Sequence, residues 1–205
     1  MARPDARHPR GTLQLNAIPL RQRIIGAAAE RTSGSGWSSV TMSGLAADVG
    51  VSRQTVYNEI GSKPALAAAM VGHELSLFLA AVEESFDAHP EDAVEAIGSA
   101  ARAVLVLSEQ NQLLRAIVTA TNGADAELLP LLTTASQDLR GTAASVLGAR
   151  LARYPIPLDQ RHVDMAVDGL VRLVLAHVMQ PADSPDETAD RIAWISSRLL
   201  NLPSP

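Results

Sequence analysis

Apolar and polar residues alternate along most of the chain with the roughly 3.6-residue period of an α-helix. The sequence shows neither the two-residue period of a half-buried strand nor a hairpin signal. The periodic segments predict nine helices, at about 19–31, 41–49, 53–60, 65–86, 91–107, 111–121, 125–153 and 158–179, and a last one after Ser184. This pattern predicts an all-α protein. Ser33-Gly34-Ser35-Gly36 is expected to end the first helix, and Ser184-Pro185-Asp186-Glu187 has the pattern of a capping box that starts the last one.

Residues 40–66 contain two short helical patterns joined by a tight turn. Thr41 and Ser52 can each accept a hydrogen bond from an otherwise unpaired main-chain N–H at the start of a helix. Gly50, between the two helices, tolerates the positive φ of a tight turn. Two short helices joined in this way form a helix-turn-helix, whose second helix lies in the major groove of DNA. The stretch is therefore predicted to bind DNA.

The outward face of the second helix carries side-chain types that read DNA. Arg pairs with guanine, Gln or Asn pairs with adenine, and the Thr methyl group can meet that of thymine. We expect Arg53, Gln54 and Thr55 at base edges, Tyr57, Asn58 and Lys63 at phosphates, and further phosphate contacts from Thr41 and Ser43. The alternative is that these are ordinary solvated residues on a short surface helix.

This stretch and the segment before it resemble the N-terminal DNA-binding domain of the tetracycline-repressor (TetR) family. The residues that carry the resemblance are Ile24, Ala27, Ala28, Val40, Thr41, Leu45, Ala46, Gly50, Val51, Ser52, Val56, Tyr57, Ser62, Lys63 and Leu66. The sequence departs from the family at Glu59-Ile60, where a histidine and a phenylalanine are more usual. Ile60 keeps the apolar role, whereas the Glu59 carboxylate would repel DNA unless a base or a nearby Arg pairs with it.

The resemblance implies a sequence-specific transcriptional regulator, a repressor that a small apolar effector releases from a palindromic double-stranded DNA operator. It also implies three regions: a flexible N-terminal arm at 1–17, a helix-turn-helix domain at 18–64, and a larger helical domain for effector binding and dimerisation at 65–205. Trp37 is expected to close the small core of the helix-turn-helix domain.

The effector, as the resemblance implies, would enter a cavity among the fourth to seventh helices. The side chains expected to line it are mostly aliphatic, which favours an apolar ligand: Met70, Leu77, Phe78, Leu105, Leu114, Val118 and Leu132. The same residues at helical spacing would also suit a plain core. A rival interpretation is a DNA-binding protein that has no small-molecule effector.

The last two predicted helices each carry a broad apolar face. The residues expected at a dimer interface are Val167, Leu170, Val171, Val174, Ile192, Ile195 and Leu199. Such helices can form the core of their own subunit or half of a four-helix bundle with a second copy. The resemblance favours the homodimer, which would bring two recognition helices to one face of DNA. Asp168 and Arg172, four residues apart, are expected to pair on the surface.

The net charge of −5 is divided unevenly along the chain. Residues 1–66 hold eight basic and four acidic residues, a net charge of +4, whereas the remainder holds nine basic and 18 acidic residues, a net charge of −9. Only the N-terminal third therefore favours contact with phosphate.

Catalytic and membrane signals are weak in this sequence. The chain has no cysteine, and its five histidines show no paired metal-binding spacing. No serine-nucleophile elbow or nucleotide-binding glycine motif occurs, so we expect no enzyme and no cofactor or metal. No uninterrupted apolar run approaches ~18 residues and no signal peptide is evident, which predicts a cytoplasmic protein without membrane contact. The alternative is an all-helical ligand-binding or enzymatic protein whose helix-turn-helix-like segment is incidental.

Overall fold

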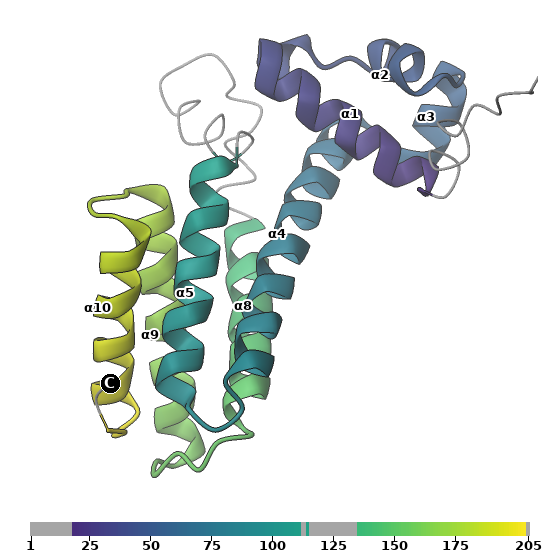
Figure 1. The fold of residues 1–205 in the computed structure, drawn as a ribbon. Coiled ribbons are helices and arrows are strands. Elements are labelled where there is room, and N and C mark those ends of the chain that lie inside the picture. Colours follow the sequence, from purple (N-terminus) through teal and green to yellow (C-terminus); the bar gives the residue numbers. More distant parts are fainter. Residues whose placement is uncertain (1–17, 112–113, 115–134, 204–205) are drawn as a thin grey trace, which may run out of the picture. The chain divides into compact units, whose positions relative to one another are not determined.

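The computed structural model describes residues 18–111, 114 and 135–203 (Figure 1). The helices are α1 (Leu20–Ser35), the short 3₁₀ helix η2 (Trp37–Ser39), α2 (Met42–Val49), α3 (Arg53–Ile60), α4 (Lys63–Ala88), α5 (Ala93–Gln110), α8 (Ala135–Leu151), α9 (Gln160–Met179) and α10 (Pro185–Leu199). No strand occurs in these described ranges. The all-α prediction is confirmed. The predicted helix at 111–121 and the first part of the one at 125–153 fall mostly outside the described residues.

The chain divides into two compact units, one that ends at Met70 and one that begins at Val71. The division falls within α4.

The first unit packs α1, α2, α3 and the start of α4 around a small apolar core. Its buried side chains include Ile24, Ala28, Trp37, Val40, Leu45, Val49, Val56, Ile60, Leu66 and Met70. Trp37 is only 2% exposed, as expected of a residue that closes this core. The Thr41 hydroxyl oxygen accepts from the Gly44 N–H and that of Ser52 from the Thr55 N–H, each at 3.0 Å. Both predicted helix caps are therefore in place.

The first helix is longer than the sequence predicted. It continues through Ser33 and Gly34 and ends only where Gly36 takes a φ of 79°. The buried Thr32 hydroxyl donates to the Ala28 carbonyl at 2.7 Å, so the last turn packs against the core with its polar group satisfied. A single Gly inside a helix costs about 1 kcal/mol, which such packing offsets.

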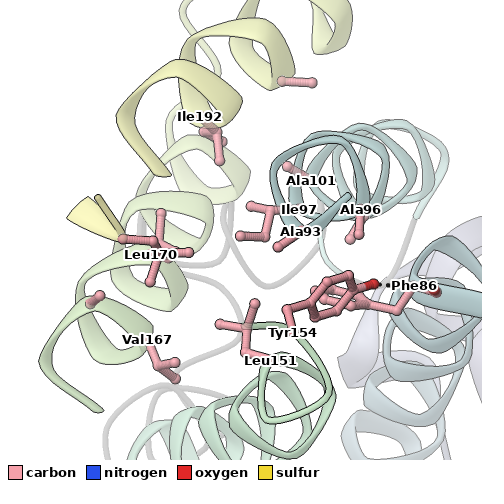
Figure 2. Close-up of a cluster of buried hydrophobic side chains, with 14 of the residues drawn as sticks. Phe86, Ala93, Ala96, Ile97, Ala101, Leu151, Tyr154, Val167, Leu170 and Ile192 are labelled. Carbon is pink, nitrogen blue, oxygen red and sulfur yellow. Dashed lines mark hydrogen bonds between the residues drawn. The ribbon is translucent and has the colours of Figure 1, made fainter. Parts of the chain in front are cut away.

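The second unit is a bundle in which α5, α8, α9 and α10 lie side by side with the second part of α4 (Figure 1). Its core gathers buried side chains from every one of these helices, among them Phe86, Ile97, Leu151, Tyr154, Val167, Leu170 and Ile192 (Figure 2). The Tyr154 hydroxyl donates to the His89 carbonyl at 2.7 Å, and its ring meets Phe86 edge to face with centroids 6.0 Å apart. These contacts fix the end of α4 against the end of α8.

A helix cap, an ion pair and a close approach at a glycine help to place the other helices of this bundle. The capping box of α10 forms as predicted, with Ser184 and Glu187 bonding each other's main-chain N–H. Asp168 accepts from Arg172 at 2.6 Å, so the predicted surface pair is present. Gly98 allows α5 to approach α10 closely, because a Cβ there would lie 3.1 Å from that of Ala193.

Helix α4 is apolar over much of its length. Its most apolar 18-residue window has a mean hydropathy of 1.7 and is 17% buried, which makes α4 the one described helix that could cross a membrane by length and composition. Glu74 interrupts the apolar sequence of this helix, and acidic side chains cost about 2.5–3.5 kcal/mol at the centre of a bilayer. Helices of soluble proteins pass the same test, so composition alone does not place α4 in a membrane.

Candidate nucleic-acid interface and effector cavity

The recognition helix α3 is anchored by its apolar side and presents polar side chains to solvent. Val56 and Ile60 are buried in the core of the first unit. Arg53, Gln54 and Asn58 are exposed. A helix fixed in this way offers its polar side chains to a partner without having to move.

Two of the exposed side chains are held by the residue one turn later. The Gln54 Nε2 donates to the Asn58 Oδ1 at 2.9 Å. The Arg53 guanidinium lies over the Tyr57 ring, 5.4 Å from its centroid, with an Nη2 to hydroxyl distance of 3.4 Å. Tyr57 is itself half-buried. These contacts were not anticipated from the sequence, although the four-residue spacing of both pairs was visible in it.

Two threonines of the predicted site take part in helix caps and also face solvent. Thr41 caps α2, and Ser43 beside it is exposed. The Thr55 hydroxyl lies 2.8 Å from that of Ser52, so it belongs to the cap of α3. Lys63 places its ammonium 4.9 Å from the centroid of the Trp37 ring. All eight residues predicted to bind DNA thus lie in the first unit, on or beside α2, α3 and the start of α4.

Three arginines of α1 bind the protein itself. Arg21 donates to the Glu59 carbonyl at 2.5 Å and Arg23 to the Val49 carbonyl at 2.6 Å, so cations lie at the C-terminal ends of α3 and α2. Arg31 forms a two-pronged pair with Asp48, whose second bond measures 2.8 Å. This hydrogen bonding holds the pKa of Asp48 below its usual value. Part of the positive charge of residues 1–66 is therefore bonded to groups of the protein itself.

A cavity of about 110 Å³ lies inside the second unit. Its lining comes from α4, α5, α8, α9 and α10 and is entirely aliphatic: Leu79, Val82, Ile97, Ala100, Val104, Ala143, Leu147, Leu170, Val171, Val174, Leu175 and Ile192. With no polar side chain in the lining, the cavity suits an apolar guest.

None of the five described residues among the seven predicted for the effector pocket lines this cavity. Met70 is buried in the first unit, Leu105 is buried in the core, and Leu77 is 48% exposed. Phe78 and Leu114 are half-buried, and Val118 and Leu132 lie outside the described residues. Of these residues, Met70, Leu77, Phe78 and Leu105 lie on α4 and α5, which both contribute to the cavity, but at positions other than those that line it. Successive helical residues are about 100° apart around the axis, so a shift of one residue redirects a side chain.

Comparison with known proteins decides the family. Residues 92–198, just over half of the chain, match the family model described as the bacterial tetracycline repressor C-terminal domain. The chain belongs to the TetR family. It is 27% identical over 174 residues to the HTH-type transcriptional regulator AlkX of Mycobacterium tuberculosis, covering 85% of this chain and 82% of that one.

Solved structures of TetR proteins have the same fold. The TetR family repressor AlkX from Dietzia sp. strain DQ12-45-1b, implicated in biodegradation of n-alkanes, is 25% identical with a TM-score of 0.70, covering 90% of this chain and 97% of its own. A TetR-like regulator from Rhodococcus sp. RHA1 has a TM-score of 0.57 at 20% identity, covering 95% and 99%. The prediction of a DNA-binding transcriptional regulator is confirmed, and the incidental-motif alternative is not favoured. TetR regulators bind DNA operators and small-molecule effectors as dimers, and they are not enzymes.

The residues predicted for the dimer interface of this TetR protein differ widely in exposure. Val167, Leu170, Val171 and Ile192 are at most 8% exposed and belong to the core of their own subunit, because their side chains face α5 and α8. Val174 packs against the same core, Ile195 is half-buried and Leu199 is 45% exposed. The large apolar side chains that α9 and α10 do expose are Met165, Leu175, Trp194 and Leu199. On the surface of α9 Met165 is flanked by Arg161, His162 and Asp168, so no apolar stripe in the sequence marks it.

Proposed function

We propose that this TetR protein is a repressor that binds a palindromic operator as a homodimer and leaves it when an uncharged aliphatic molecule enters the cavity of the second unit. The observation that carries the proposal is the exposed polar side of α3, fixed to the core by Val56 and Ile60. A second copy would present the same helix to the second half-site, one helical turn of DNA away.

The proposed DNA contacts follow from exposure and hydrogen bonding in the first unit. Arg53 and Gln54 are exposed at the start of α3, where recognition helices meet base edges. Ser43 and Lys63 are the phosphate contacts, one exposed beside the start of α2 and one at the start of α4. Thr41 and Thr55 already serve the helix caps, so we assign them the role of fixing both helix starts beside the DNA backbone.

The proposed effector is aliphatic and carries no charge, because nothing in the cavity lining could pair with a charge. A cavity of about 110 Å³ is smaller than the ~150 Å³ that admits benzene in a protein core. A longer hydrocarbon chain must therefore widen the bundle as it enters. A ligand that binds the widened form better than the closed form shifts the protein toward it. The n-alkane connection of the Dietzia relative agrees with this ligand class.

The proposed dimer surface is formed by the exposed apolar side chains of the last two helices. Met165 on α9 is 63% exposed and Trp194 on α10 is 53% exposed, and large exposed apolar side chains are typical of interaction surfaces when they form a patch. Leu175 and Leu199 are exposed on the same pair of helices, α9 and α10. We place the protein in the cytoplasm, where its DNA target lies.

Selection of bound duplexes from a random DNA pool, followed by a salt titration on the enriched sequences, tests the DNA part of the proposal. We expect an enriched palindrome whose affinity falls steeply as salt rises, because bound phosphates release counterions. Asymmetric single sites would contradict the dimer. Failure to enrich any sequence, with protein shown by mass analysis to carry no ligand, would contradict operator binding.

A thermal-shift series of ligands tests the effector class. Linear alkanes and uncharged fatty alcohols should raise the melting temperature, since a ligand that binds only the folded state stabilises it more as its concentration rises above the dissociation constant. Matched fatty acids and alkylamines of the same length carry a charge and should have no such effect. A screen in which only charged compounds raise the melting temperature would overturn the proposal. Leu170→Gln, which places an amide in the cavity wall, should weaken the response to alkanes.

A further inference from the structure

The recognition helix carries two parallel side-chain pairs, each four residues apart. Arg53 lies over Tyr57, and Gln54 bonds to Asn58. In each pair the earlier residue is exposed and lies at the start of α3, where base contacts are made. The later residue of each pair therefore acts on the earlier one before any DNA is present.

The bond between Gln54 and Asn58 determines what Gln54 can offer to a base. A free glutamine amide can turn so that its oxygen and nitrogen exchange places. Here one N–H of Gln54 Nε2 is directed to the Asn58 Oδ1, 2.9 Å away, and this bond restricts the rotation of the Gln54 amide beside Asn58. Gln54 keeps its Oε1 as an acceptor and one N–H as a donor. These two groups match the N6 amino group and N7 of adenine.

The contact between Arg53 and Tyr57 orients a guanidinium in the same way. The guanidinium carbon lies 5.4 Å from the centre of the Tyr57 ring, and the ring is half-buried on the flank of α3. Stacking on an aromatic face uses the plane of the guanidinium and leaves the N–H groups along its edge available. Two such N–H groups match the O6 and N7 of guanine.

We propose that Tyr57 and Asn58 are positioning residues for Arg53 and Gln54, and that each operator half-site contains a guanine read by Arg53 and an adenine read by Gln54. This inference rests on the proposed operator binding. It replaces the phosphate contacts expected for Tyr57 and Asn58 from the sequence. A phosphate contact and a positioning contact predict different losses: the first weakens binding to every sequence alike, and the second weakens discrimination at one base pair.

The Asn58 role is tested on the operator selected by the wild-type protein, by measuring binding to duplexes with each base substituted in turn. Asn58→Ala should reduce discrimination at the adenine position by about five- to 150-fold, the range of one bidentate base contact, and leave the guanine position unchanged. Asn58→Asp keeps an oxygen that accepts from Gln54, so it should retain the adenine preference although its added charge weakens binding to all duplexes. Ser43→Ala is the control for a phosphate contact, with uniform weakening.

The Tyr57 role is tested by comparing Tyr57→Phe with Tyr57→Leu on the same duplexes. Phenylalanine keeps the ring beneath Arg53 and should preserve the guanine preference, whereas leucine should reduce it by a similar five- to 150-fold. Melting curves monitored by circular dichroism show that each variant remains folded.

Each outcome bears on the inference in one direction. Base preferences that change at the two named positions support it. Uniform weakening by Asn58→Ala, or equal uniform weakening by both Tyr57 variants, would show phosphate contacts and overturn it. A wild-type protein that enriches no sequence would instead refute the proposed operator binding, so the two failures are distinguishable.

Discussion

The two units of this TetR protein place their functional residues in opposite ways. In the first unit the candidate site lies on the surface, where Arg53, Gln54 and Asn58 are exposed on a helix whose other side is buried. In the second unit the candidate site is a partly open cavity between helices with a fully aliphatic lining. The first unit has to keep its surface geometry fixed to read DNA. The second has to yield from within to admit a ligand.

The two units also differ in what fixes their helices to one another. Arginines of α1 bond the helix-turn-helix from outside, through the Val49 and Glu59 carbonyls and the Asp48 carboxylate. In the second unit Arg150 of α8 pairs with Glu83 and Asp87 of α4, but the candidate cavity itself is surrounded by aliphatic packing alone. Polar bonds of defined direction preserve an orientation, whereas aliphatic packing permits adjustment. This difference agrees with a first unit that holds a fixed DNA-binding surface and a second unit that can deform to bind a ligand.

The largest expected effect is the loss of stability when a core residue of the second unit is truncated, compared with truncation of a surface residue on the same helix. Ile192→Ala should lower the free energy of unfolding by about 2–5 kcal/mol, because Ile192 is 0% exposed and its removal enlarges a cavity. Denaturant unfolding followed by circular dichroism measures this. Leu199→Ala on the same helix is the control: Leu199 is 45% exposed, so its effect should appear as weaker dimerisation in sedimentation runs across protein concentrations. A concentration-independent loss for Leu199→Ala would contradict the surface role.

The next effect concerns a polar contact inside the second unit. Tyr154→Phe should cost about 1–3 kcal/mol, because the His89 carbonyl loses its donor at 2.7 Å in a partly buried site. The same denaturant titration provides the measurement. Tyr57→Phe in the first unit removes a hydroxyl whose contact is 3.4 Å from Arg53 on an exposed face, and it should leave stability nearly unchanged. Equal losses of stability in the two variants would mean that the Tyr154 bond stabilises the protein no more than the exposed Tyr57 contact.

Sequence reasoning succeeded where local chemistry decides the structure. The caps at Thr41, Ser52 and Ser184 and the turn at Gly50 depend on residues within a few positions of one another, and all of them form. The all-α fold and the family followed from the same local patterns. The end of α1 was misjudged because the packing of Thr32, which carries the helix past Gly34, involves distant residues.

The candidate cavity and the exposed apolar side chains of α9 and α10 depend on long-range packing, which the sequence pattern does not show. α9 presents Leu170 and Val171 inward and Met165 outward, yet all three are simply apolar in the sequence. Which apolar face of a helix meets its own bundle is decided by helices far along the chain. The side-chain pairs on α3 were visible as i, i+4 spacings, but their use was not, because the same spacing fits phosphate contacts equally well.

A smaller effect compares the helix caps of the two units. Ser52→Ala should cost about 1 kcal/mol through loss of the bond to the Thr55 N–H, and it should also weaken operator binding by loosening the start of α3. Ser184→Ala removes the corresponding cap of α10 and should cost a similar amount of stability without changing affinity for DNA. Thermal melting and duplex binding provide the two readouts. Equal losses of DNA affinity in the two variants would show that the start of α3 has no special role in DNA recognition.

The smallest expected effect is a pH dependence of stability that should differ between the two units. Asp48 joins α1 to α2 through Arg31, whereas Asp168 pairs with Arg172 within α9, and hydrogen bonding lowers the pKa of both carboxyls. A carboxyl with a lowered folded-state pKa contributes stability above its unfolded pKa of about 3.9, and this contribution is lost as the pH falls through the folded-state pKa. Neutral pH therefore favours both pairs, and the difference should appear below about pH 4.

Two tryptophans allow the units to be followed separately in that titration. Trp37 is buried in the first unit and Trp194 is exposed in the second, so Trp194→Phe leaves Trp37 as a reporter of the first unit. In that background, Asp48→Asn should make the Trp37 melting transition less sensitive to pH between 7 and 3, because the charge that is lost in acid is already absent. Asp168→Asn should leave this transition unchanged, since Asp168 pairs with Arg172 of α9 and Arg140 of α8, both in the other unit. If both substitutions flattened the pH dependence equally, the Arg31 pair would not be what holds α1 to the helix-turn-helix, and the contrast between the units would have to rest on packing alone.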